Sequence, residues 1–173
     1  GREEEMAALT AAVDESPQGP VVVHVRGLSG MGKSELVRRW LSLLRGRGDC
    51  VALTGRCNPQ EIIPYKAFDS VVDELWELLR RMPVEQCIGL VPHHAAELTR
   101  LFPVLASLPG FDSEGADGAG RPDPHEARRR GFAAFRELVS SLARRSSLVL
   151  WIDDVQWGDI DSLRLLGALV GGP

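Results

Sequence analysis

A short glycine-rich segment, set between an apolar run and an amphipathic one, constrains this chain more than any other feature of its sequence. Residues 27–34 are Gly-Leu-Ser-Gly-Met-Gly-Lys-Ser, which is Gly, four residues, Gly, Lys and a hydroxyl residue. Before them, the run Val-Val-Val-His-Val at 21–25 is typical of a buried parallel strand. After them, apolar residues recur at helical spacing at Leu36, Val37, Trp40, Leu41 and Leu44. A loop that joins a strand end to a helix start in this way predicts an α/β fold.

The residue types in the loop suit the phosphates of a nucleotide. Glycine lets the backbone curl until several N–H groups point at one anion, and the following helix adds the positive end of its dipole. Lys33 can reach the β and γ phosphates, and the Ser34 hydroxyl suits a Mg²⁺ that bridges them. The alternative is a glycine-rich turn without a ligand, which the flanking strand and helix make weaker. The predicted nucleotide-binding residues of the loop are Gly27, Gly30, Met31, Gly32, Lys33 and Ser34.

A pair of acidic residues follows a second apolar run. Residues 148–152 are Leu-Val-Leu-Trp-Ile, and Asp153 and Asp154 come directly after them. Because parallel strands deliver their last residues to one edge of a sheet, we expect these acids to meet the glycine-rich loop. Asp153 is predicted to hold Mg²⁺ through water, whereas Asp154 and Lys33 are the predicted catalytic residues, with Asp154 orienting or deprotonating the attacking water. A role for Asp154 as a cap of the next helix stays open.

The composition limits the class of protein. The 173 residues are 44% hydrophobic, which suits one soluble domain with a substantial core. No apolar stretch approaches the roughly 20 residues that span a bilayer, and the first residues are unlike a signal peptide, so we expect a cytoplasmic protein without membrane contact. The balance of 20 basic against 24 acidic residues argues against direct contact with nucleic acid. Cys50, Cys57 and Cys87 lack metal-ligand spacing and are expected to be reduced.

The remaining pattern completes an alternation of strands and helices. Strands are expected at 21–25, 50–56 and 148–152, and helices at 3–15, 32–45, 64–82 and 123–145. One or two shorter helices, broken at Pro92, are expected over 86–102. The helical segment at 86–102 contains His93, His94 and Glu97, but adjacent helical positions point apart, so a solvated helix start is preferred over a metal site. Residues 109–122 are rich in Gly and Asp and predict a flexible loop. The order favours a three-layer α/β/α fold with a mainly parallel sheet.

Four stretches resemble one family of P-loop NTPases, the AAA-like domains (ASCE type) of the STAND class, the signal-transduction ATPases with numerous domains. They are Gly-Arg-Glu at 1–3, the loop at 27–34, Gly-Arg-Cys at 55–57 with Pro-Tyr-Lys-Ala-Phe at 64–68, and Trp-Ile-Asp-Asp-Val-Gln-Trp-Gly-Asp at 151–159. The last stretch is the most specific. The resemblance covers the whole chain. The stretch at 64–68, together with Leu-Phe-Pro-Val-Leu at 101–105, favours domains linked to Ser/Thr protein kinases over LuxR-type transcription regulators.

The resemblance implies that this domain binds ATP or ADP together with Mg²⁺. It places Gly1 and Arg2 near the base and ribose, assigns the metal to Asp153, and assigns the water to Asp154. Domains of this kind continue with a sensor strand, which lies between the strands at 21–25 and 148–152, and with a lid. Residues 1–173 are therefore expected to form a C-terminally truncated, partial domain whose sheet is interrupted where its two motifs should meet.

The function expected from these features is an ATP-binding and ATP-hydrolysing regulatory module of a larger signal-transduction protein. Its partners would be the nucleotide and the attached kinase, DNA-binding or repeat domains, and it could form a homo-oligomer. Two alternatives stay open, namely a nucleotide-dependent interaction scaffold that does not hydrolyse ATP, and a small-molecule P-loop kinase. The kinase is the weaker of the two, because the Gly/Asp-rich loop carries only Arg121 and no arginine-rich lid is evident.

Overall fold

A computed structural model of the chain describes residues 2–16, 19–48, 50–59, 63–112 and 123–171. The α-helices are α1 (Glu3–Glu15), α2 (Lys33–Arg47), α3 (Asp69–Leu79), α4 (Val84–Ile88), α5 (Ala95–Leu101), α6 (Pro124–Ala143) and α7 (Ile160–Val170). Short 3₁₀ helices are η2 (Lys66–Phe68), η3 (Pro103–Ser107) and η5 (Val155–Trp157), and the strands are β1 (Cys50–Arg56) and β2 (Ser147–Asp153). None of the described helices has the length and apolar content needed to cross a membrane.

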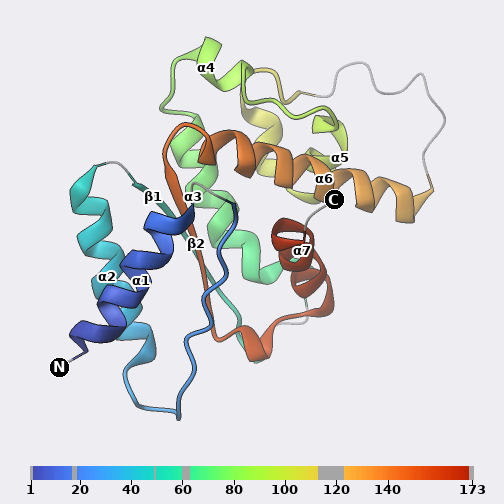
Figure 1. The fold of residues 1–173 in the computed structure, drawn as a ribbon. Helices are drawn as coiled ribbons and strands as arrows, with labels where there is room; N and C mark the ends of the chain where they lie inside the picture. The colour runs from blue at the N-terminus through green and yellow to red at the C-terminus, as the bar shows by residue number, and fades with distance from the viewer. Residues whose placement is uncertain (1, 17–18, 49, 60–62, 113–122, 172–173) are drawn as a thin grey trace.

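The two strands form a parallel pair with helices on both faces. Their register runs from Cys50 opposite Ser147 to Arg56 opposite Asp153, so both strands end at the same edge. Helices α1 and α2 lie on one side of the strands, and α3 and α6 lie on the other (Figure 1). This arrangement has the three layers of the predicted α/β/α fold around a sheet of two strands.

Alternation along β2 decides which layer each side chain contacts. Val149 and Trp151 pack on the α1 and α2 side, where Val37 and Trp40 belong to the same cluster. The alternate positions Leu148, Leu150 and Ile152 pack against the larger core on the other side. Since Asp153 continues the first set, its side chain is directed to the face that α2 covers.

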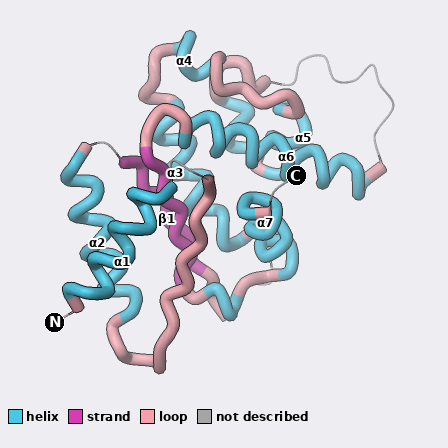
Figure 2. Tube along the Cα trace, viewed as in Figure 1, coloured by secondary structure: helices cyan, strands magenta, loops and turns pink. Residues whose placement is uncertain are grey.

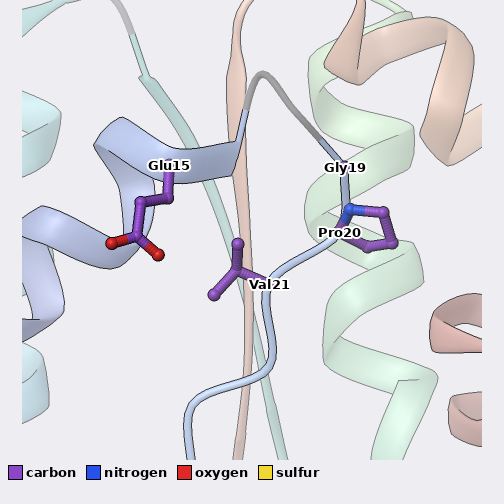
Figure 3. A pocket seen from close by; sticks show the side chains of 4 residues that line it. All are labelled: Glu15, Gly19, Pro20 and Val21. Atoms are coloured by element: carbon purple, nitrogen blue, oxygen red, sulfur yellow. The ribbon is translucent and has the colours of Figure 1, made fainter.

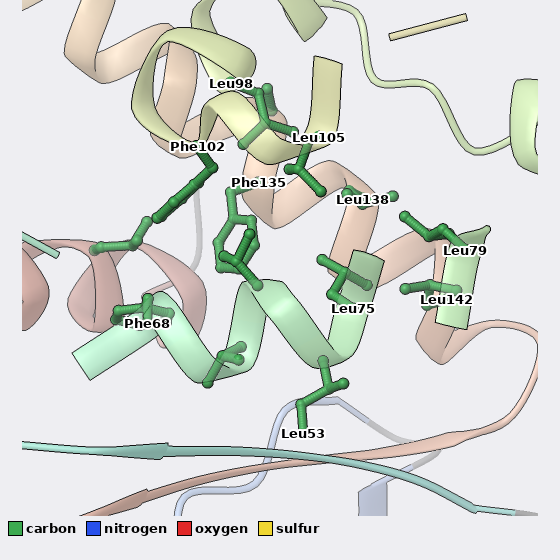
Figure 4. Packing of buried hydrophobic residues seen from close by; sticks show 14 of the residues in the cluster. Leu53, Phe68, Leu75, Leu79, Leu98, Phe102, Leu105, Phe135, Leu138 and Leu142 are labelled. Carbon is green, nitrogen blue, oxygen red and sulfur yellow. The ribbon is translucent and has the colours of Figure 1, made fainter. Parts of the chain in front are cut away.

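The larger core lies between α3, α5, η3 and α6. In Figure 4, Leu75 and Leu79 of α3 meet Leu138 and Leu142 of α6, and Phe135 lies among them. Burying each such side chain stabilises the fold by about 1.5–3 kcal/mol. Leu53 of β1 belongs to this core, and Leu150 and Ile152 of β2 pack against it.

The predicted buried strand at 21–25 is wrong for this structure. The segment is a loop that joins neither β1 nor β2 (Figure 2), and its valines are 38–52% exposed. A strand needs a neighbour for its N–H and C=O groups, and at the outer edge of β1 the backbone N–H of Thr54 donates instead to the Glu74 carboxylate (2.9 Å).

Other predicted elements agree with the structure in type and differ in extent. The segment at 64–82 divides into η2 and α3, and the segment at 86–102 divides into α4 and α5, as a break within it allows. Of the predicted flexible loop at 109–122, residues 113–122 lie outside the described residues. Gly55 allows the backbone of η2 to lie close to β1, because a Cβ atom at Gly55 would lie 2.1 Å from the carbonyl oxygen of Ala67.

Candidate nucleotide-binding site

The glycine-rich loop leads directly into α2. Gly32 is the N-cap of this helix, and both Gly30 (φ +80°) and Gly32 (φ +73°) have left-handed backbones. An L-residue at such an angle costs roughly 1–2 kcal/mol, so these two glycines fit the turn that the loop makes. The first N–H groups of α2 have no partner within the helix and carry its positive dipole end, which is the arrangement that binds phosphate at helix starts.

Lys33 curls back over the loop. Its Nζ donates to the carbonyl oxygens of Gly27 (2.9 Å) and Leu28 (3.0 Å). The ammonium group therefore lies beside the loop backbone, with exposed carbonyl oxygens as its partners. A phosphate oxygen carries more negative charge than a carbonyl oxygen and would compete for the same donor.

Ser34 and Asp153 are in direct contact although 119 positions separate them in the sequence. The Ser34 hydroxyl donates to Oδ1 of Asp153 (2.9 Å), and the Asp153 side chain is 14% exposed. The structure thus brings the predicted metal residues together at the carboxyl edge of the sheet. A hydroxyl oxygen and a carboxylate are the hard ligands that Mg²⁺ prefers, with water and phosphate oxygens completing the shell, so these residues fit the metal. Among the described residues, no group of three or more His, Cys, Asp or Glu side chains forms another metal site.

Asp154 has a different environment from Asp153. Its backbone is left-handed (φ +55°), and its carboxylate accepts hydrogen bonds from Arg56 Nη2 (3.2 Å) and Gln156 Nε2 (3.1 Å). Arg56 is the last residue of β1, so Asp154 is directed to β1, whereas Asp153 is directed to α2. The Asp153 side chain thus contacts Ser34 at the end of the glycine-rich loop, whereas the Asp154 side chain pairs with Arg56.

Helix α7 is capped by Asp159, whereas Asp154 is the N-cap residue of the short helix η5 and makes no side-chain hydrogen bond to its backbone. The Asp159 carboxylate accepts the N–H groups of Asp161 (3.0 Å) and Ser162 (2.8 Å), and also that of Tyr65 (3.2 Å) from the segment before η2. Burial raises the pKa of Asp159, but the hydrogen bonds from Ser162, Tyr65 and Asp161 outweigh it and hold the pKa below its ordinary value. Asp159 therefore fixes the chain that follows the acidic pair.

Arg2 reaches the loop from the start of α1. Its Nη2 donates to the carbonyl oxygen of Met31. Helix α1 is held on α2 by a hydrogen bond from Trp40 Nε1 to Thr10 Oγ1 (3.1 Å) and by burial of Leu9. Arg2 thus lies beside the loop, while Gly1 falls outside the described residues.

Two arginines in this region were missed by sequence reasoning. Arg56 contacts Asp154, and Nη2 of Arg38 lies 3.8 Å from Oδ2 of Asp153. The available signal was position, since Arg56 ends a strand that is parallel to β2 and Arg38 follows Ser34 by one helical turn.

Cys57, next to Arg56, is buried and free. Burial and then the carboxylates of Asp159, Asp154 and Asp153 raise the pKa of its thiol, which favours the inert protonated form.

Two hollows of the structure lie away from these residues. One, of about 450 Å³, lies between the end of α1 and the following segment and is lined by Glu15, Gly19, Pro20 and Val21 (Figure 3). A second, of about 390 Å³, is lined by residues of α5, α6 and their neighbours. Neither lining includes a predicted site residue, and residues 27–32 of the loop are exposed.

Comparison with known proteins adds one finding to this geometry. A family model of the AAA ATPase domain matches residues 1–173, which is the whole sequence. No curated protein and no solved structure matches the chain. This family implies nucleotide binding, usually with Mg²⁺. The glycine-rich loop at a helix start, the Ser34–Asp153 contact and the family match together show that the chain belongs to the AAA ATPase domain family.

Proposed function

We propose that this chain is an ATP-binding, ATP-hydrolysing regulatory module of a larger cytoplasmic signal-transduction protein, linked to a protein kinase or to a transcription regulator. The observation that carries the proposal is the hydrogen bond from Ser34 to Asp153, because it joins the two motifs on which nucleotide chemistry depends. Family membership supports the nucleotide and the metal. The signalling partners, including attached output domains and a homo-oligomer, rest on the sequence resemblance alone.

Binding would use the backbone and four side chains. The N–H groups at the start of α2 hold phosphate oxygens, and Lys33 leaves its two carbonyl partners to add a positive charge. Ser34 and Asp153 hold Mg²⁺, which neutralises charge on the phosphates when it is bound. Arg2, which contacts the loop at Met31, adds a second cationic group at the nucleotide.

Hydrolysis would require Asp154 to change partners. A carboxylate that orients a water molecule must face the bound nucleotide, yet Asp154 is held by Arg56 and Gln156 at the end of β1 in this structure. The side chains of Arg56 and Asp154 are 60% and 34% exposed, so their separation costs little and hydrolysis can follow. The same contacts support a second candidate, a scaffold that binds nucleotide and does not hydrolyse it. No described contact favours the third, a small-molecule kinase.

A calorimetric titration of the full-length protein with Mg·ADP tests the binding step. Loss of one charge-assisted contact of about 1.5–3 kcal/mol predicts that Lys33→Ala weakens binding by roughly 10- to 150-fold. The matched control is Lys66→Ala, because Lys66 is the other lysine of the chain and pairs with Asp69 away from the loop. Equal affinities of the Lys33→Ala variant and the wild type would remove Lys33 from the site.

A further inference from the structure

The Asp153 carboxylate lies between a hydroxyl group and a cation of the same helix. Oδ1 accepts hydrogen bonds from Ser34 Oγ (2.9 Å) and from the backbone N–H of Asp154 (3.1 Å), and Oδ2 lies 3.8 Å from Arg38 Nη2. With 14% of its side chain exposed, Asp153 has lost much of its hydration, and a carboxylate in that position is stabilised by a nearby positive charge. Lys33 does not supply this charge, since its ammonium group contacts loop carbonyls.

Two neighbours keep the Arg38 guanidinium in this position. Its central carbon lies 5.9 Å from the centre of the Trp151 ring, and Trp151 is directed to the same face of β2 as Asp153. Its Nη1 lies 3.5 Å from Oε2 of Glu35, one turn earlier on α2. The Arg38 side chain is nevertheless 53% exposed, so the guanidinium can move into water without a large desolvation change.

We propose that Arg38 sets the magnesium requirement of this site, by acting as the counter-charge of Asp153 whenever no metal is bound. The inference rests on the proposed binding of Mg²⁺ by Ser34 and Asp153. A cation 3.8 Å from Oδ2 repels a second cation, so Mg²⁺ alone binds weakly. The phosphates of a nucleotide bring the negative charge that offsets this repulsion. Mg²⁺ and nucleotide therefore bind together, and Arg38 weakens the binding of Mg²⁺ when no nucleotide is present.

The test compares three full-length proteins, namely the wild type, Arg38→Gln and the control Arg39→Gln. Arg39 is the next residue of α2 and is exposed. Mn²⁺, followed by electron paramagnetic resonance, reports metal binding without nucleotide, and calorimetry reports the Mg²⁺ concentration that half-saturates ADP binding. We expect Arg38→Gln to bind Mn²⁺ about threefold to tenfold more tightly, as removal of one partly exposed charge predicts, and to lower the required Mg²⁺ concentration by a similar factor. Arg39→Gln should match the wild type.

A charge effect is separated from a packing effect by two further variants. Arg38→Lys keeps the charge and should stay close to the wild type, whereas Arg38→Met keeps an apolar stem beside Trp151 and should behave like Arg38→Gln. In an Asp153→Asn background, Arg38→Gln should change Mn²⁺ binding by less than about twofold, because without the Asp153 carboxylate the metal ion is no longer held beside Arg38.

If the wild type binds Mg·ADP but both uncharged variants bind Mn²⁺ no more tightly than it does, the proposed role of Arg38 is overturned and the proposed function still stands. Absence of magnesium-dependent ADP binding in the wild type would overturn the proposed function, and this inference with it. Circular dichroism checks that each variant is folded. If Arg38→Gln does not fold, Mn²⁺ binding by Arg38→Met provides the test.

Discussion

Replacement of Arg56 by Gln should raise the rate of ATP hydrolysis, because the ion pair with Asp154 is the main contact that holds this carboxylate on β1. The pair joins Nη2 to Oδ2 at 3.2 Å, and its side chains are 60% and 34% exposed. Ion pairs with this exposure contribute about 0.2–1 kcal/mol, and the hydrogen bond from Gln156 to Oδ1 remains in the variant. If that energy must be supplied before Asp154 can orient water, its loss raises kcat by about 1.4- to fivefold.

The assay is steady-state phosphate release by the full-length protein, with nucleotide affinity measured separately by calorimetry. We expect Arg56→Gln to change kcat without changing the affinity for Mg·ADP, since Arg56 has no described contact with the loop. Asp154→Asn should abolish turnover in the wild type and in the Arg56→Gln variant alike. A fall in kcat on replacement of Arg56 would refute the reasoning, because Arg56 would then assist catalysis rather than withhold Asp154.

Two other predictions concern the elements that position the site. Gly55→Ala should destabilise the protein by about 1–3 kcal/mol in urea unfolding, because its Cβ would lie 2.1 Å from the Ala67 carbonyl oxygen. Gly46→Ala, near the end of α2 with open space around its Cβ, should instead stabilise it by up to about 0.5–1 kcal/mol, and equal effects of the two changes would contradict the close approach. Asp159→Asn should lower stability near neutral pH by about 1–2 kcal/mol, measured by unfolding at several pH values. Since the pKa of Asp159 lies below its ordinary value of 3.8, its contribution is complete above that pH and is lost as the pH falls through the lower folded value, so the two proteins should converge in acid.

The position of Asp153 could be predicted from a general rule, because a parallel strand carries its last residue to the carboxyl edge of the sheet. Its contact with Ser34 depends on the packing of α2 on β2, where Val37 and Trp40 cluster with Val149 and Trp151, and not on the predicted strand at 21–25, which the structure lacks. Helix α2 was likewise predictable, since its buried residues Leu36, Val37, Trp40, Leu41 and Leu44 carry a clear period of 3.6. These features need only local pattern and strand direction.

The state of residues 21–25 could not be predicted in the same way. Their apolar side chains are suited to a buried strand, but strand formation also requires a hydrogen-bonding neighbour, and no property of these five residues specifies whether one is present. The role of Asp154 was uncertain for a related reason. A single left-handed residue after β2 turns its carboxylate towards Arg56, and the sequence does not reveal that angle.

Asp159 shows a third kind of limit. Its position in the family-like stretch at 151–159 was noticed, but its partner Tyr65 is 94 positions away and contributes only a backbone N–H, which any residue type could supply. Contacts of this kind leave no pattern in a single sequence. The structure shows that Asp159 ties the segment before η2 to the start of α7.

Binding of a non-hydrolysable ATP analogue by Ser34→Ala and Asp153→Asn, measured once with Mg²⁺ and once with a chelator, tests most directly whether these two residues form a metal site for a nucleotide on the loop. We expect each variant to weaken binding by about tenfold or more with Mg²⁺ and by less than about twofold with the chelator, because each removes a metal ligand or its support and leaves the phosphate-binding amides intact. Equal losses under both conditions, or no loss under either, would contradict the account.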